Sequence, residues 1–342
     1  MTNLNYWYAY LLRYYTGREW AKNKVTRAEM RLLKSSKRYM DGEVQEIERI
    51  PYNSISIDDF RKNYLNKNKP VVLEGFGNGW PALEKWDIDF FSDNYGEEMI
   101  PMRINASVIG ENKIEFVKTK FKNFVKDLND GKDVYASSIE NIANNNPELR
   151  SDLSIKQLSE YTHMRKNRRI LSTQFFISNS LAKTALHCAV STNMFTQIKG
   201  QKVWTLIDPR YSKWLHVAYR NNMLYAASFV DYNKTNDEIT QDGFPLYRYA
   251  PKIKATLNPG DGLLIPQWWW HSVDNIGFSV GVASRGVNYR NIFKGNTLFT
   301  LQALGSRKIW NFLKAIRKHG WGTDETSPET AYIEKKEPEL TV

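Results

Sequence analysis

Two histidines, His187 and His271, stand in sequence surroundings that suit a metal site. The first opens the segment HCA at 187–189, and the second closes the segment IPQWWWH at 265–271. Imidazole nitrogens bind divalent transition metals, and an Fe(II) site with open positions commonly uses two histidines and one carboxylate. Side chains on one face of a strand recur every second residue, so the carboxylate would be expected at position 189. That residue is Ala189, whose methyl group cannot bind a metal.

Three interpretations follow from Ala189. The chain has lost the metal, has changed its third ligand, or has made room for an anion from solution. His163 and His216 are possible replacement ligands, although nothing in their spacing favours them. Cys188 should point to the opposite strand face, so we interpret it as a small buried hydrophobic residue and not as a ligand.

The composition is that of a globular protein of 342 residues, with 42% hydrophobic and 25% charged residues. No run of 18 apolar residues is present, so no transmembrane segment is expected. The N-terminus has no pattern of a secretory signal. With a single cysteine, the chain has no internal disulfide and suits a reducing compartment, so a cytoplasmic location is expected.

The net charge of +11 is concentrated near the N-terminus, where residues 1–40 carry nine Lys or Arg against two acidic residues. Aromatic residues are interspersed among these charges. The segment could dock on an anionic membrane or an acidic partner. The alternative, which we favour, is a helix whose aromatic face packs on the core and whose lysines are solvated. No nucleic-acid partner is expected, because no recognisable binding motif accompanies the charge.

The chain divides into four predicted parts. Residues 1–44 form a basic, aromatic, helical segment, and residues 45–295 form the main domain. A helix is predicted over 296–320, and an acidic, flexible tail over 321–342. Within the main domain, Ser56 and Asp59 predict a helix N-terminus, and residues 118–129 have helical spacing.

The barrel core is predicted over about 171–290. Short β-type runs bounded by Pro, Gly, Asn and Asp favour a mainly β fold with flanking helices, built on an antiparallel barrel or double-stranded β-helix. An irregular insertion is predicted at 208–250, where it would be functional or mobile.

Two barrel motifs carry a resemblance to a known family. The segments TALHCA at 184–189 and NMFTQIKGQK at 193–202 resemble the metal and co-substrate motif of the cupin-like JmjC 2-oxoglutarate oxygenases. This group includes the factor-inhibiting asparaginyl hydroxylase. The segment NPGDGLLIP at 258–266, with the following WWH, resembles the second-histidine motif of the same family. The resemblance covers most of residues 45–290 and implies a jelly-roll barrel with Fe(II), 2-oxoglutarate and dioxygen.

The resemblance also implies roles for individual residues. His187 and His271 match the iron ligands. Lys202 matches the lysine that pairs with the distal carboxylate of 2-oxoglutarate, and Thr184 matches a hydroxyl that hydrogen-bonds the same co-substrate. Asn193 matches a polar position that lines the site.

Ala189 departs from the family pattern, which has Asp at this position. Iron/2-oxoglutarate halogenases resemble this chain in carrying Ala or Gly there, and chloride occupies the space. In those enzymes an Fe(IV)-oxo species abstracts a substrate hydrogen, and the carbon radical then takes chloride. Asn193, Ser272 or Arg285 could help hold the anion. Arg285 follows the predicted last strand, where the family more often has an aromatic residue.

Three functions therefore stay open. The favoured one is a halogenase that chlorinates an unactivated carbon, with Ala189, Asn193 and Arg285 around the halide. The second is a hydroxylase with a two-histidine metal site, and the third is a catalytically inactive cupin-like binding protein. The substrate would be a small molecule or a group borne on a carrier or peptide. The helix at 296–320 could form a homodimer or pack on its own domain.

Overall fold

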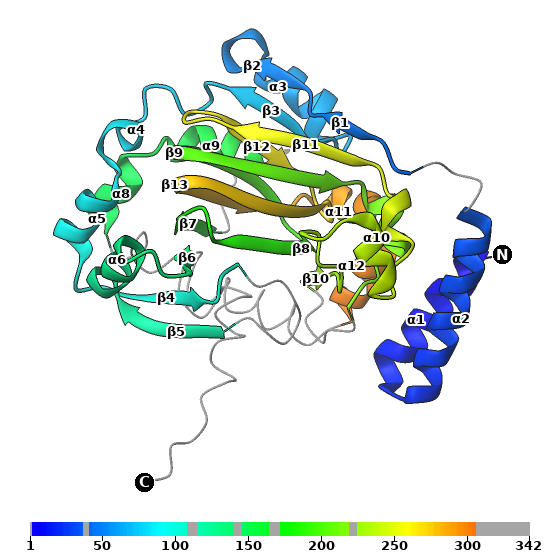
Figure 1. Cartoon of the computed structure of the whole chain (residues 1–342). Coiled ribbons are helices and arrows are strands. Elements are labelled where there is room, and N and C mark those ends of the chain that lie inside the picture. Colours follow the sequence, from blue (N-terminus) through cyan, green and yellow to red (C-terminus); the bar gives the residue numbers. More distant parts are fainter. Residues whose placement is uncertain are drawn as a thin grey trace.

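One large, curved sheet dominates the molecule, with helices around it (Figure 1). The computed structural model describes residues 2–36, 41–107, 115–139, 142, 146–163, 172–218 and 224–305. The strands in these ranges are β1 Val44–Glu46, β2 Arg49–Pro51, β3 Val71–Glu74, β4 Met99–Ile104, β5 Glu115–Lys120, β6 Val134–Ile139, β7 Ser172–Ser178, β8 Lys183–Ala189, β9 Thr192–Ile207, β10 Tyr225–Ala227, β11 Lys252–Leu257, β12 Gly262–Ile265 and β13 Trp270–Gly286.

The helices lie at the N-terminus, over one side of the sheet and after the last strand. They are α1 Thr2–Thr16, α2 Glu19–Ser36, α3 Ile57–Phe60, α4 Pro81–Lys85, α5 Ile88–Tyr95, α6 Phe121–Asn129, α8 Pro147–Ser151, α9 Ile155–Thr162, α10 Asn236–Gln241, α11 Tyr289–Gly295 and α12 Thr297–Leu304. Short helices of other types are η1 Tyr52–Ser54, η2 Arg61–Leu65, η3 Pro209–Trp214 and η4 Tyr247–Tyr249.

Two long strands, β9 and β13, form the centre of the sheet and pair with each other along most of their length. The first half of β9 also pairs with β12, and its second half pairs with β11. Gly200 separates the halves at a φ of 64°, a backbone conformation that suits glycine. Each long strand therefore contributes to both halves of a curved barrel, and the predicted mainly β fold with flanking helices is confirmed.

Three large apolar clusters stabilise this arrangement. One fills the space between the sheet and helices α5, α6 and α9, and it includes Phe91, Phe124 and Phe175. A second lies inside the barrel around Phe195 and Trp204. The third joins α1, α2 and α12 to the segment after β9. The site described below lies where the second and third clusters meet.

Several local predictions can be compared with the structure. Ser56 does cap a helix, since its hydroxyl accepts the backbone N–H of Asp59 at 3.1 Å. The helix predicted over 118–129 begins only at Phe121, because the preceding residues belong to β5. The segment 208–250 is less irregular than predicted and contains η3, β10, α10 and η4.

The C-terminal predictions fall mostly outside the described residues. Of the helix predicted over 296–320, the structure describes α12 and Gly305, and the tail over 321–342 lies beyond them. Among the helices that the structure describes, none combines the length and the apolar character needed to span a bilayer.

Candidate functional site

His187 and His271 lie directly opposite each other on the antiparallel strands β8 and β13. Their ring centroids are 4.1 Å apart. In each residue Nδ1 lies close to the carbonyl oxygen two residues earlier, at 2.8 Å from Ala185 and 2.9 Å from Trp269. When Nδ1 donates its proton to that carbonyl, Nε2 carries the lone pair that a metal needs. The same backbone contact therefore orients both imidazoles for ligation.

A pocket opens beside the two imidazoles, and Ala189 forms part of its wall. The wall of this pocket contains both apolar side chains and polar side chains that can contact an anion. The other lining residues are Ser191, Asn193, Tyr225, Ile265, Pro266, Trp269 and Arg285. Within the part of the chain that the structure describes, no third His, Cys, Asp or Glu joins the histidine pair. A third metal ligand of these types is thus absent from the described residues.

Strand register explains why the polar groups gather here. Arg285 on β13 lies opposite Asn193 on β9, and Tyr225 on β10 lies opposite Ala189 on β8. Residues directly opposite each other in an antiparallel pair project from the same face of the sheet. The Asn193 side-chain oxygen is buried and has no hydrogen-bond partner among the described residues. A ligand in the pocket could provide one.

Two details of the predicted anion site are corrected by the structure. Arg285 does not follow the last strand but belongs to it, because β13 extends to Gly286. Ser272 is adjacent to His271 on the same strand, so its side chain projects from the opposite face, and it does not line the pocket. Of the three suggested anion contacts, Asn193 and Arg285 line the pocket.

Lys202 lies deeper inside the barrel, on the same face of β9 as Trp204. Its side chain is 1% exposed and donates a hydrogen bond to the Asn275 side-chain oxygen. The Tyr135 ring centroid lies 5.8 Å from its ammonium nitrogen. Among the described residues no carboxylate pairs with this ammonium group, and burial lowers its pKa to about 7. A buried cation in neutral surroundings is suited to an anionic ligand.

Thr184 reaches the same face as His187 through an irregularity in β8. His187 pairs with His271, but Thr184 pairs with Val273. A distance of three residues along β8 therefore corresponds to two residues along β13. The extra residue changes the alternation of side chains, as a β-bulge does. Because Val273 shares a strand face with His271, Thr184 is placed on the face that carries His187 and His271.

The Trp204 ring connects the two ends of this face. Its centroid lies 5.7 Å from that of His271 and 4.8 Å from that of Phe195. The buried Trp204 Nε1 has no hydrogen-bond partner among the described residues. Lys202 and the histidine pair therefore belong to one continuous interior surface.

Several residues of this region had no recognisable signal in the sequence. Tyr225 lies on a strand of three residues inside the insertion, and its ring centroid is 5.1 Å from that of His187. Tyr135 and Arg103 come from β6 and β4, and they lie opposite each other in register. Burial lowers the pKa of Arg103. Only the pairing of strands distant in sequence brings these side chains to the site.

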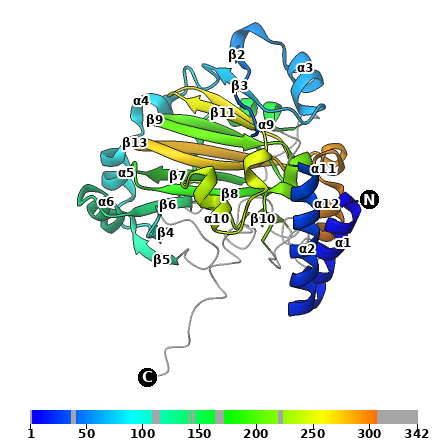
Figure 2. The same ribbon diagram turned by 45° about the vertical axis from the view of Figure 1, so that its right-hand side comes forward.

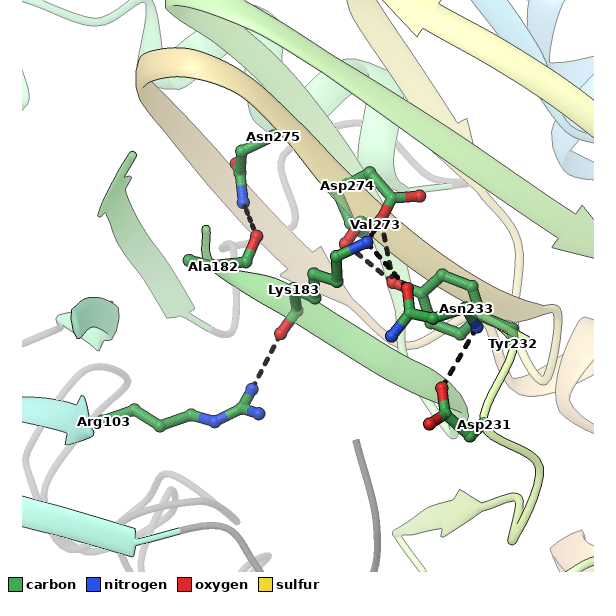
Figure 3. A network of polar contacts seen from close by, with 9 residues as sticks. All are labelled: Arg103, Ala182, Lys183, Asp231, Tyr232, Asn233, Val273, Asp274 and Asn275. Carbon is green, nitrogen blue, oxygen red and sulfur yellow. Dashed lines mark hydrogen bonds and ion pairs between the residues drawn. The ribbon is translucent and has the colours of Figure 1, made fainter. Parts of the chain in front are cut away.

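A polar network holds β8 against β13 beside Thr184 (Figure 3). Lys183 Nζ donates to Asp274 at 3.1 Å and to Asn233 at 2.7 Å, while its carbonyl oxygen accepts from Arg103 at 2.8 Å. Asn275, the partner of Lys202, donates to the carbonyl oxygen of Ala182 at 2.5 Å. The network fixes the Asn275 amide so that its oxygen faces Lys202.

The other candidates from the sequence lie elsewhere. Cys188 is fully buried in the cluster on the opposite face, as expected, and burial raises the pKa of its thiol. His216 contacts Glu29 of α2, with Nδ1 3.1 Å from the carboxylate. His163 is buried beside Gly286. Neither histidine lines the pocket.

Comparison with known proteins identifies the domain family of this chain. The model of the cupin-like domain family matches residues 57–294. The lysine-specific demethylase JMJ21 of Arabidopsis thaliana is 29% identical over 249 residues, which are 70% of this chain and 25% of the relative. Lysine-specific demethylase 8 of Xenopus tropicalis is 24% identical over 231 residues, 67% of this chain and 50% of the relative.

A third relative is closer in length. The human tRNA wybutosine-synthesizing protein 5 is 25% identical over 252 residues, 67% of this chain and 74% of the relative. The chain spans only a quarter to a half of the two demethylases. Because the family model matches well over half of its residues, this chain belongs to the cupin-like domain family.

Proposed function

We propose that this protein is an Fe(II)- and 2-oxoglutarate-dependent halogenase that chlorinates an unactivated carbon of its substrate. Ala189 carries the proposal, because its methyl group lies in the wall of the pocket that both histidines line. The family pattern has a carboxylate at this position, and its loss removes one negative charge and several atoms of volume. A monatomic anion restores the charge and fits the space.

The residues present fit the metal. His187 and His271 would hold Fe(II) through Nε2, since the Nδ1 of each ring faces a backbone carbonyl. In the described part of the chain, the remaining ligands must come from groups other than His, Cys, Asp and Glu. A chelating 2-oxoacid and a halide are ligands of that kind.

The residues also fit 2-oxoglutarate. Lys202 would bind the distal carboxylate of the co-substrate. The Tyr135 ring lies beside its ammonium group, and Thr184 lies on the strand face that carries His187, so the two hydroxyls would add hydrogen bonds. Asn275 keeps the ammonium group in position before the ligand arrives. The carboxylate would supply the negative charge that balances the buried ammonium group of Lys202. This need is the strongest reason for a ligand of this class.

The halide would be held by groups around Ala189. The Arg285 guanidinium contributes positive charge, and the Asn193 amide and the hydroxyls of Tyr225 and Ser191 can donate hydrogen bonds. Ile265, Pro266 and Trp269 form the apolar part of the same wall and limit the access of water. When bound, Fe(II) with 2-oxoglutarate and dioxygen would supply the oxidation of a substrate C–H bond, and the bound halide would supply the atom transferred to carbon.

A hydroxylase is the second candidate function. One relative, of Caenorhabditis elegans, is named a bifunctional arginine demethylase and lysyl-hydroxylase, with 21% identity over 258 residues. In this candidate, water or the Tyr225 oxygen would take the place of the missing carboxylate, and chloride would have no effect. For either candidate we propose a small-molecule substrate or a group borne on a carrier or peptide.

The test is an anaerobic titration with Fe(II) and then 2-oxoglutarate, followed by visible absorbance with and without chloride. A metal-to-ligand charge-transfer band that shifts with chloride supports the halogenase. Sodium sulfate at equal ionic strength serves as the control for general salt effects. A band that ignores chloride favours the hydroxylase, and the absence of a band contradicts both.

The matched variant is Ala189→Asp. The new carboxylate should bind the metal, raise the Fe(II) affinity and remove the effect of chloride on the band. Ala189→Gly, which keeps the position free of a ligand, should retain the chloride effect. An unchanged chloride response in Ala189→Asp would mean that residue 189 does not control the anion.

A further inference from the structure

The N-terminal hairpin, formed by α1 and α2, stands beside the barrel in both views (Figures 1 and 2). It precedes the segment that matches the cupin-like family, so the family fold does not account for it. Gly17 allows the sharp turn between the helices with a φ of 63°. The described residues of the hairpin carry seven Lys or Arg and two Glu. The placement of these charges differs between its two faces.

The inner face of the hairpin packs on the body of the protein. Its buried side chains include Tyr6 and Tyr10 on α1 and Val25 and Leu32 on α2. Trp7 meets Phe299 of α12 with ring centroids 5.9 Å apart. The Glu29–His216 contact adds a polar connection to the insertion. The hairpin is therefore anchored in a fixed orientation.

Phe299 also connects the hairpin to the active-site strand. Its ring centroid lies 5.6 Å from that of Trp268 and 6.3 Å from that of Trp270. Trp270 is the residue before His271. Continuous aromatic packing thus connects the hairpin to the strand that lines the pocket. Any surface on which the hairpin docks would have a fixed orientation relative to that pocket.

The outer face of α1 exposes large apolar side chains, which we name the apolar row. Leu4 is 79% exposed, Tyr8 59% and Tyr15 69%. Their spacing of four and seven residues places them on one side of the helix. Exposed apolar side chains of this size in a row are uncommon unless another surface covers them.

The outer face of α2 carries the cationic row, Lys24, Arg27 and Arg31, which continues from Trp20. These four residues are all exposed, and their spacing of four, three and four places them along one side of α2. The Lys24 ammonium nitrogen lies 5.1 Å from the ring centroid of Trp20 and 5.9 Å from that of Tyr8. The apolar row and the cationic row are therefore neighbours on one surface.

We propose that this outer face docks on a lipid surface with anionic headgroups. Trp20, Tyr8 and Tyr15 would lie at the headgroup level, Leu4 would enter the acyl boundary, and the cationic row would pair with lipid phosphates. An interface of this kind needs apolar and positively charged side chains next to each other, which the hairpin provides. Each cation near an anionic leaflet should strengthen binding about fivefold.

Other anionic partners fit the same face less well. A polynucleotide would neutralise the cationic row but would leave Leu4 and Met30, which is 51% exposed, in water. A single acidic protein surface would meet the same difficulty. A lipid surface takes up both kinds of side chain.

The test is co-sedimentation of the full chain with vesicles. We expect binding to phosphatidylcholine vesicles that contain phosphatidylglycerol, little binding to pure phosphatidylcholine, and weaker binding as salt rises. Arg27→Glu with Arg31→Glu should reduce binding at least tenfold. Lys118→Glu with Lys126→Glu makes the same charge change at exposed positions on β5 and α6, and it should leave binding nearly unchanged.

A second readout tests whether Trp20, beside the two rows, enters the lipid surface. Phospholipids with brominated acyl chains should quench part of the tryptophan fluorescence of the natural chain, and Trp20→Phe should lose most of that quenching. Thermal unfolding checks that each variant folds. We expect all of them to fold, because the substituted side chains are exposed. Absence of vesicle binding, equal binding to neutral and anionic vesicles, or binding to polyuridylic acid in place of vesicles would overturn the proposal.

Discussion

The interior surface of the barrel has two ends that differ in how they present positive charge. At one end Lys202 is enclosed, 1% exposed, and contacts only neutral side chains among the described residues. At the other end Arg285 is half-buried and shares a pocket wall with two histidines and Ala189. In the described residues no carboxylate pairs with Lys202, and no further His, Cys, Asp or Glu completes the histidine pair.

The difference between the two ends indicates that each would bind a different kind of anion. The enclosed lysine can accept only a ligand that enters deeply and carries its own charge, such as the distal carboxylate of 2-oxoglutarate. The wall around Ala189 would accept a small anion beside the proposed metal. One end would thus fix the co-substrate, and the other would decide which atom is transferred. The predictions below test each end separately, from the largest expected effect to the smallest.

Removal of one imidazole should have the largest effect. His271→Ala leaves a single protein ligand of the histidine type, so Fe(II) affinity should fall at least a hundredfold. An anaerobic titration, with bound iron measured after desalting, checks this result. Cys188→Ala is the matched control, because residue 188 is next to His187 but lies on the opposite strand face. Iron binding that survives in His271→Ala would disprove the assignment of this ligand.

Lys202→Met should affect only the enclosed end. The loss of a buried charge-assisted contact should weaken 2-oxoglutarate binding about a hundredfold, while Fe(II) binding should change little. The variant should also unfold at a higher temperature without ligand, because a desolvated cation has been removed. Isothermal titration and thermal unfolding measure the two effects. Equal loss of iron and co-substrate binding would mean that the two ends are not independent.

The lowered pKa of Lys202 predicts a pH dependence. Only the protonated amine pairs with a carboxylate, and its pKa falls from 10.5 to about 7 on burial. The affinity for 2-oxoglutarate should therefore be level below about pH 7 and fall roughly tenfold per pH unit above it. Lys202→Met should show no such slope.

The same group has the opposite effect on the stability of the ligand-free protein. The folded chain releases this proton above about pH 7, whereas the unfolded chain keeps it until about pH 10.5. The cost of burying the charge is thus fully present below pH 7 and becomes smaller as pH rises towards 10.5. Denaturant unfolding at pH 6.5 and 9, compared between the natural chain and Lys202→Met, should reveal this difference.

Tyr225→Phe should have the smallest effect, at the pocket wall. Its hydroxyl is one of several groups near the expected anion, so its loss should weaken the chloride response about three- to tenfold. Fe(II) and 2-oxoglutarate binding should stay unchanged. The measurement is the chloride concentration that gives half of the shift in the charge-transfer band. A large loss of iron binding would instead identify the Tyr225 oxygen as the third ligand.

Much of the fold could be predicted from local signals in the sequence. The strands of the barrel core follow from β-type runs bounded by turn residues, and the cap at Ser56 follows from its spacing to Asp59. The two histidines and Lys202 stand in recognisable motifs, so the prediction of their roles needed no structure. Helix and strand boundaries were less accurate, as the start of α6 after β5 illustrates, because both patterns place apolar residues at short intervals.

The sequence by itself determined the residue types of the site: two histidines, an alanine in place of a carboxylate, and a lysine at a fixed spacing. The tertiary structure alone decided which neighbours surround them. Tyr225, Tyr135 and Asn275 come from three separate strands, and their approach depends on strand register, which is fixed by pairing between residues far apart in the chain. The offset at Thr184 has the same origin, because a bulge is a property of two paired strands and leaves no pattern in one of them.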